Sequence, residues 1–150
     1  MGVTLDQQEI EDFLKNGHTL IVSTIDKDGY PHSTPVWYVY HEGHVYFRVR
    51  GATIKAKGLL RNPKVAVLVE SGERWRDLKA VLIRGRAEPV TDTAFHDRFD
   101  ALLDAKYANF REAREAMPAR TQQHYSTSKL YVRVVPEKRT ASWDNRKIRM

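Results

Sequence analysis

One short stretch of the sequence, residues 51–57 (Gly-Ala-Thr-Ile-Lys-Ala-Lys), combines residue types that bind phosphate. Thr53 is typical of a residue that caps the start of a helix, where unpaired backbone N–H groups and the positive end of the helix dipole attract anions. Lys55 and Lys57 follow in the first turn of this predicted helix. The segment therefore predicts a phosphate site, with a surface helix on a solvated basic edge as the alternative.

Two arginines precede this segment on a predicted strand. Residues 45–49 alternate so that Tyr46, Arg48 and Arg50 share one face of the strand. A guanidinium group can donate two parallel hydrogen bonds to a phosphate. Arg48 and Arg50 are therefore expected to contact the same anion from the side of the sheet.

A proline interrupts another predicted strand and suggests a contact for a flat ligand. Pro35 removes a donor from the hydrogen-bond ladder, which is typical of a strand edge or a bulge. Backbone groups beside it are then free to bond a planar heterocycle, although Trp37 could equally pack in the core. The residues of interest here are Ser33, Thr34, Pro35, Val36 and Trp37.

Other chemistries have little support. His41 and His44 lie in a predicted turn without an obvious third ligand, so no metal site is expected. The chain has no cysteine, no Gly-x-Ser-x-Gly elbow and no Walker loop, which argues against thiol, serine-hydrolase and P-loop chemistry. The absence of cysteine also suits a cytoplasmic protein.

Composition favours one globular domain over residues 1–150. The chain has 25 Lys and Arg against 19 Asp and Glu, a net charge of +6, which indicates an anionic partner for some surface. No nucleic-acid-binding motif accompanies this charge, and no apolar run is long enough for a membrane span. Residues 1–16 are polar and acidic, where a signal peptide would be basic and then apolar. We therefore expect neither nucleic acid nor membrane as a partner.

The hydrophobic pattern predicts a mainly β protein. Helices are expected after a capping box at residues 4–7, after Thr53 with Ile54, Leu59 and Leu60 facing inward, and from Thr93 through residue 117. Six β-branched segments are expected to form a small antiparallel β-barrel flanked by these helices. They are residues 19–25, 33–40, 45–49, 64–70, 78–90 and 129–135.

An indole stands in the polar segment that follows the last predicted strand. Trp143 is expected either to dock on the barrel or to reach across a dimer interface, where tryptophan is favoured as an anchor. The alternative is a frayed terminus.

Four motifs in this order resemble the pyridoxamine 5′-phosphate oxidase-like split β-barrel superfamily, and more narrowly its flavin/deazaflavin branch, the F420-dependent oxidoreductases. The resemblance covers nearly the whole chain. The motifs are Asp28-Gly29-x-Pro31-His32, Pro35-Val36-Trp37-Tyr38, the run Lys55-Ala56-Lys57-Gly58-Leu59-Leu60-Arg61-Asn62-Pro63, and Ser142-Trp143-Asp144-x-Arg146-Lys147.

The resemblance implies a six-stranded FMN-binding-like split barrel that forms a homodimer, with cofactor sites between the subunits. It assigns phosphate contacts to Thr53, Lys55 and Lys57, with Arg48 and Arg50 nearby. It also places the strand from Ser33 to Trp37 along the cofactor ring and Trp143 over the site.

Two departures from the pyridoxamine phosphate oxidases are visible. The tail lacks their Arg-x-His element, so pyridoxamine phosphate is not the expected substrate. Ile54 stands where those oxidases tend to have an arginine, which argues against a simple transfer of FMN binding.

The resulting prediction is a flavoprotein-like oxidoreductase that binds coenzyme F420 and transfers a hydride to a small organic acceptor. The alternatives are an FMN-dependent oxidoreductase of the same fold and a non-catalytic flavin, deazaflavin or haem binding protein. Tyr38, Ser33 or a solvent molecule could donate a proton. Five basic residues are available for the oligoglutamate tail of F420: Arg74, Arg76, Lys79, Arg146 and Lys147.

Overall fold

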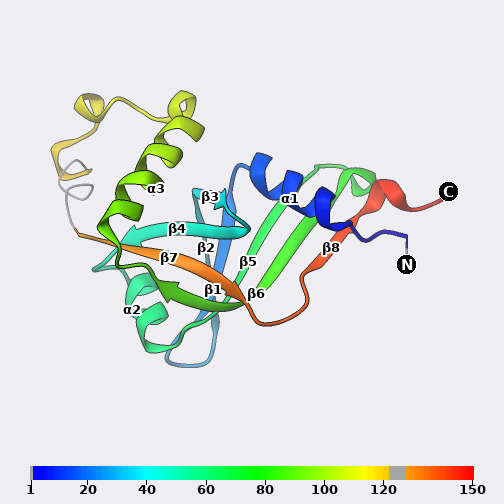
Figure 1. The fold of residues 1–150 in the computed structure, drawn as a ribbon, viewed down its shortest axis with the longest axis horizontal. Coiled ribbons are helices and arrows are strands. Elements are labelled where there is room, and N and C mark those ends of the chain that lie inside the picture. Colours follow the sequence, from blue (N-terminus) through cyan, green and yellow to red (C-terminus); the bar gives the residue numbers. More distant parts are fainter. Residues whose placement is uncertain (1, 122–127) are drawn as a thin grey trace.

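The computed structural model describes residues 2–121 and 128–150, and its strands form one strongly curved antiparallel sheet (Figure 1). The described residues form eight strands and three α-helices. The helices are α1 (Gln7–Asn16), α2 (Ile54–Arg61) and α3 (Thr93–Lys106). The strands are β1 (Leu20–Ile25), β2 (Pro31–Val36), β3 (Tyr38–His41), β4 (His44–Arg50), β5 (Lys64–Ser71), β6 (Lys79–Pro89), β7 (Lys129–Pro136) and β8 (Ala141–Asp144).

The order of the strands explains why the sheet closes into a barrel. The order is β2-β1-β5-β6-β7-β4-β3, so β2 and β3 form the two edges of the sheet. These edge strands are separated in the chain by Trp37 alone. The chain therefore carries one edge directly into the other, and the barrel is split at this junction.

The long strand β6 bends where it changes partner. Its first residues pair with β8, and its last residues, from Gly85 onward, pair with β7. A Cβ atom at Gly85 would lie 2.0 Å from the backbone oxygen of Val135. Glycine is therefore required for the close approach of the two backbones at this bend.

The barrel interior is packed with aliphatic side chains from alternate positions of the strands. Leu20 and Val22 of β1 and Val67 of β5 are buried on this inner face. Helix α1 contacts β3 and β6, and α2 contacts β1 and β4. The start of α1 is fixed by a capping box between Asp6 and Glu9.

A second apolar cluster lies on the outer face of the barrel, beneath α3. Phe99 and Leu103 of the helix pack there against Val39 of β3, Tyr46 of β4 and Tyr131 of β7. Tyr46 and Phe47 are both buried because β4 is covered by the core on one side and by α3 on the other. The face of β4 that carries Arg48 and Arg50 is therefore the face toward α3.

The prediction of a mainly β split barrel is confirmed, but the structure has eight strands where six were expected. The segment 33–40 is divided at Trp37, and the tail adds β8 because it pairs with the start of β6. No helix in the described ranges is long and apolar enough to cross a membrane.

Three predictions about the helices were wrong. The first helix is capped by Asp6, two residues after Thr4, because Asp6 accepts from the Glu9 N–H. Ile54 and Leu60 are 76% and 62% exposed, since α2 buries only the face with Ala56, Gly58 and Leu59. Helix α3 ends at Lys106, where the backbone passes into a short 3-10 turn.

Candidate functional site

A cleft of about 840 Å³ lies where β2 ends, between β4, the start of α2 and α3. It contains seven residues that the sequence singled out: Pro35, Val36, Trp37, Arg48, Arg50, Thr53 and Lys55. The rest of its wall consists of Val49, Asp100, Leu103, Asp104, Phe110, Arg111, Glu112, Met117 and Lys129.

The start of α2 has the capped geometry expected of an anion site. The Thr53 hydroxyl accepts from the Ala56 N–H at 3.1 Å and donates to the Arg50 carbonyl at 2.8 Å. This fixes the Arg50–Thr53 turn. Burial lowers the pKa of the Lys55 ammonium, and the nearby Arg50 lowers it further. An anion beside Lys55 would offset both effects.

Lys57 does not join this site. It is exposed and outside the cleft. Successive helical residues are rotated by about 100°, so side chains two positions apart point in nearly opposite directions. Lys55 and Lys57 therefore cannot both face one anion from the first turn of α2.

The two arginines of β4 differ in their partners. Arg48 is ion-paired with Asp100 of α3, and the Tyr131 hydroxyl donates to the same carboxylate at 2.9 Å. Burial raises the pKa of Tyr131, and its hydrogen bond to Asp100 raises it further. Arg48 is thus held against α3. Arg50 lies opposite Lys129 across the β4–β7 ladder, so these two and Lys55 form the cationic part of the cleft.

Trp37 contacts two side chains from the segment that follows α3. Its indole stacks on the ring of Tyr107, with centroids 4.3 Å apart and planes within 7°. The guanidinium of Arg111 lies 5.3 Å from the indole centroid. The Tyr107 hydroxyl donates to the His18 carbonyl at 2.6 Å. The aromatic wall of the cleft is therefore positioned by the end of α3.

The residues predicted as proton donors lie elsewhere. Tyr38 is fully buried and donates to the Leu14 carbonyl, and burial raises its pKa. The Ser33 hydroxyl is 2.7 Å from that of Ser23 on the exterior of the β1–β2 pair. Neither side chain lines the cleft.

Thr34 also points away from the cleft. It lies opposite Val22, whose side chain is in the core, and its buried hydroxyl has no partner among the described residues. Because side chains alternate along a strand, Thr34 faces the interior of the barrel and Ser33 its exterior. Only Pro35, Val36 and Trp37 of the five predicted residues reach the cleft.

Trp143 lies on β8, away from the cleft of its own chain. It is opposite Ala80 on the outer face of the sheet and is 37% exposed. A row of partly exposed apolar residues crosses this same face. In ladder order it consists of Pro35 of β2, Ile21 of β1, Leu68 of β5, Leu82 of β6 and Ala141 of β8.

The sequence reasoning missed the wall that α3 and the following segment provide. Asp100, Leu103 and Asp104 are spaced as one helical face, and this pattern could have indicated a second contact surface beside the stripe with Phe99. Lys129 had no such signal, since its place beside Arg50 depends on the β4–β7 register.

The arrangement suits a ligand that is anionic at one end and flat at the other. Cations and a helix start lie on one side, and the end of β2 with the stacked Trp37 lies on the other. In the described ranges, no three His, Asp or Glu side chains are grouped as metal ligands.

Comparisons with known proteins agree with this fold. The family model described as pyridoxamine 5′-phosphate oxidase matches residues 6–138. A conserved hypothetical protein from Mycobacterium tuberculosis is 30% identical, with a TM-score of 0.81 over 97% of this chain and 89% of that one. No curated protein matches the chain significantly.

Two more distant structures share the fold. A protein from Mesorhizobium loti described as FAD-binding is 22% identical, with a TM-score of 0.68 over 93% of this chain and 94% of that one. A structure described as an F420 reductase is 20% identical, with a TM-score of 0.63 over 87% and 94% of the two chains.

Proposed function

Because the chain belongs to the pyridoxamine 5′-phosphate oxidase family, we propose that it is an oxidoreductase that binds coenzyme F420 in the cleft and transfers a hydride to a small organic acceptor. The observation that carries the proposal is the meeting of three features in one cleft. These are the proline-containing end of β2, the stacked Trp37, and the cations around the start of α2.

The donor set of the cleft fits a phosphate-bearing, planar cofactor. Lys55, Arg50 and Lys129 would hold the phosphate, with the Thr53 cap fixing the turn between them. The backbone at Pro35 and the indole of Trp37 would lie beside the ring system. A bound deazaflavin would supply the hydride. The protein residues would hold the cofactor in place, exclude water and stabilise its charges.

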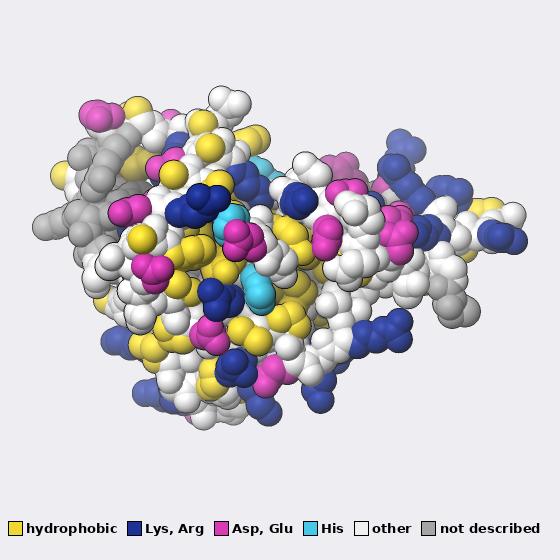
Figure 2. Space-filling view, viewed as in Figure 1, with side chains coloured by type: hydrophobic (Ala, Val, Ile, Leu, Met, Phe, Trp, Pro, Cys, Tyr) yellow, Lys and Arg dark blue, Asp and Glu magenta, His cyan; other side chains and the backbone are white. Residues whose placement is uncertain are grey.

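The choice of F420 over FMN rests on charge away from the phosphate. Basic side chains gather near the end of the molecule that carries both termini (Figure 2). Two of the five residues expected to serve the oligoglutamate tail already have partners, since Arg146 pairs with Asp77 and Lys147 with Glu9.

The other three of these cations are not in ion pairs. In the part of the chain that the structure describes, Arg74, Arg76 and Lys79 have no carboxylate within 4.0 Å. The Lys79 side chain faces Phe13 of α1 in a separate pocket, so Arg74 and Arg76 are the cations proposed for the tail of F420. FMN, which has no oligoglutamate tail, would leave these two groups unused. It remains the alternative cofactor.

A homodimer is part of the proposal. The apolar row from Pro35 to Ala141 has β5 at its centre. If two copies pack these faces with the two-fold axis along β5, β2 of one subunit lies over β8 of the other. Such packing buries the row and brings the partner's Trp143 toward the Pro35 side of the cleft.

The second candidate is a protein that binds a flavin, deazaflavin or haem without turnover. The burial of Tyr38 favours it, since no tyrosine among the described residues lines the cleft to protonate a product. If the protein is an oxidoreductase, a solvent molecule would supply the proton to the product.

An absorption and fluorescence titration of the purified protein tests the proposal. F420 should quench on binding and bind more tightly than FMN or haem, and reduced F420 should be oxidised on addition of an activated-alkene acceptor. Binding without turnover for a broad acceptor panel would support the second candidate, and no spectral response to any of the three would overturn both.

A further inference from the structure

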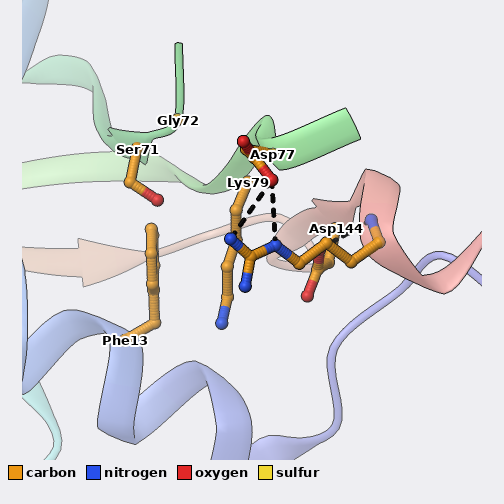
Figure 3. Close-up of a pocket in the computed structure, with 7 residues that line it drawn as sticks. Phe13, Ser71, Gly72, Asp77, Lys79 and Asp144 are labelled. Carbon is orange, nitrogen blue, oxygen red and sulfur yellow. Dashed lines mark hydrogen bonds and ion pairs between the residues drawn. The ribbon is translucent and has the colours of Figure 1, made fainter. Parts of the chain in front are cut away.

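A second cleft lies at the other end of the barrel, between α1 and the strands β5, β6 and β8 (Figure 3). Its volume is about 370 Å³, and it shares no lining residue with the cleft described above. It is lined by Phe13, Ser71, Gly72, Asp77, Lys79, Asp144 and Arg146.

One wall of this second cleft is a row of three polar residues. Ser71 lies opposite Lys79 in the β5–β6 ladder, and Lys79 lies opposite Asp144 in the β6–β8 ladder. Directly opposed residues of antiparallel strands project from the same face, with Cβ atoms about 4.5–5.5 Å apart. A hydroxyl, an ammonium and a carboxylate thus stand side by side facing α1.

The two charged members of this row do not neutralise each other. No carboxylate lies within 4.0 Å of the Lys79 ammonium in the described ranges; the ammonium lies 5.0 Å from the centroid of the Phe13 ring instead. Asp144 is only 8% exposed, and its carboxylate accepts a hydrogen bond from the Arg146 N–H at 3.0 Å. A partly desolvated charge without an opposite charge is costly, so a ligand that pairs with both would be stabilised.

The opposite wall is fixed by the β5–β6 loop. Arg146 contacts one oxygen of Asp77 through two nitrogens, at 3.2 and 3.1 Å. Gly72 has a φ of +99°, and a Cβ atom there would lie 2.1 Å from the Asp77 backbone oxygen. The loop can therefore hold Asp77 against Arg146 only because residue 72 is glycine. The dashed lines in Figure 3 mark this Arg146–Asp77 contact.

These charges restrict the chemistry of a ligand. A simple anion attracted to Lys79 would be repelled by Asp144, and a simple cation attracted to Asp144 would be repelled by Lys79. A ligand with a carboxylate and an ammonium a few bonds apart meets both requirements. The cleft, at about 370 Å³, has room for several water molecules and so for a ligand of this size.

We propose that this second cleft binds a free α-amino acid, through its carboxylate to Lys79 and Ser71 and through its ammonium to Asp144. The Phe13 ring, released from Lys79, would contact the nonpolar part of the ligand.

The test is calorimetric titration of the full chain with the common L-amino acids, one at a time, and with acetate and methylammonium as single-charge probes. At least one amino acid should bind, and neither single-charge probe should. Lys79→Met and Asp144→Asn should each weaken binding at least tenfold. Asparagine keeps an oxygen for the Arg146 N–H, and methionine keeps the contact with Phe13, so both variants should remain folded.

Arg74→Met, in the same loop but outside the cleft, is the matched control and should bind like the unchanged protein. Phe13→Ala checks the aromatic contact. No binding by any amino acid, equal binding by the Lys79 and Asp144 variants, or acetate binding as well as the amino acid would overturn the proposal. Because none of these residues lines the first cleft, FMN affinity measured on the same variants separates this result from that of the proposed function.

Discussion

The indole of Trp37 lies flat on the phenol ring of Tyr107, at a centroid distance of 4.3 Å. Trp37 is the single residue between the two edges of the sheet, and Tyr107 is fully buried directly after α3. The junction of the barrel and the aromatic wall of the cleft are therefore fixed by the same contact.

This contact predicts a stability effect. Tyr107→Phe keeps the stacked ring but removes the hydroxyl that donates to the His18 carbonyl at 2.6 Å. The same hydroxyl also accepts from the buried Tyr38 N–H at 3.3 Å, and leaving that donor without its acceptor should lower the free energy of unfolding by about 1–3 kcal/mol. Urea denaturation measures the change. Tyr30→Phe, at a side chain that is 69% exposed, should change it by less than about 0.5 kcal/mol.

The two lysines of α2 should separate in a binding experiment. Lys55→Ala should weaken cofactor binding by about 1.5–3 kcal/mol, since it removes a charge-assisted contact inside the cleft. Lys57→Ala is the matched control and should bind almost unchanged, because its side chain lies outside. Fluorescence quenching measures both affinities. Equal losses in the two variants would mean that the phosphate is bound at another place.

Stability should depend on pH through Lys106. Burial lowers the pKa of its ammonium from 10.5 to about 8, while its Nζ donates to the Tyr38 carbonyl at 3.2 Å. Between these two values the unfolded chain binds more protons than the folded one, so the free energy of unfolding should rise with pH from 8 toward 10.5.

The contribution of Lys106 is isolated by comparing variants across this pH range. Tyr38 and Tyr107 have raised pKa values and oppose the rise at the alkaline end, but they are present in every variant. In urea titrations, the free energy of unfolding of the unchanged protein should rise with pH relative to that of Lys106→Met. The control Lys15→Met, at an exposed site, should show the same pH dependence as the unchanged protein. Parallel curves for all three proteins would contradict the assignment.

The apolar row on the outer sheet face should mediate dimerisation. Light scattering should give twice the chain mass of 17.4 kDa. Leu68→Glu, at the centre of the row, should give a monomer and weaken cofactor binding as well, because burying a charge in such an interface is costly. Arg84→Glu, an exposed site on the same face but outside the row, should leave the dimer intact. A monomeric unchanged protein at micromolar concentration would exclude this interface.

Added salt should distinguish the two cofactors. Screening lengths fall to about 10 Å at 0.1 M salt, so binding that involves more exposed charge pairs loses more affinity. The F420 affinity should fall more steeply with salt than the FMN affinity, and Arg74→Ser with Arg76→Ser should reduce this difference. The same slope for both cofactors would favour FMN.

Much of the fold could be read from the sequence because each signal is local. Thr53 predicts the start of α2, and the alternation in β4 places Arg48 and Arg50 on one face. The sequence also shows that Lys55 and Lys57 point to nearly opposite sides of α2, because they are two residues apart on a helix. The family resemblance nevertheless implies that both contact the phosphate.

Other features depend on contacts that are remote in the chain. The Arg50–Lys129 pair and the Arg48–Asp100 ion pair follow from the packing of β7 and α3 on β4. The break at Trp37 follows from Tyr107, which is 70 residues away. The strand β8 forms because the tail meets β6, and two of its four residues, Ala141 and Asp144, are of types depleted in strands.

The pairing of β4 with β7 has a consequence for how the protein is made. It joins Arg48 to Tyr131, so the barrel cannot close until most of the chain has left the ribosome. Such distant pairings carry a large loop-closure entropy and slow the folding of β proteins. Until β7 is synthesised, the nascent chain exposes an unpaired β4 edge and the aliphatic inner face of β1 and β5. During this interval the chain is most prone to aggregate and to bind chaperones.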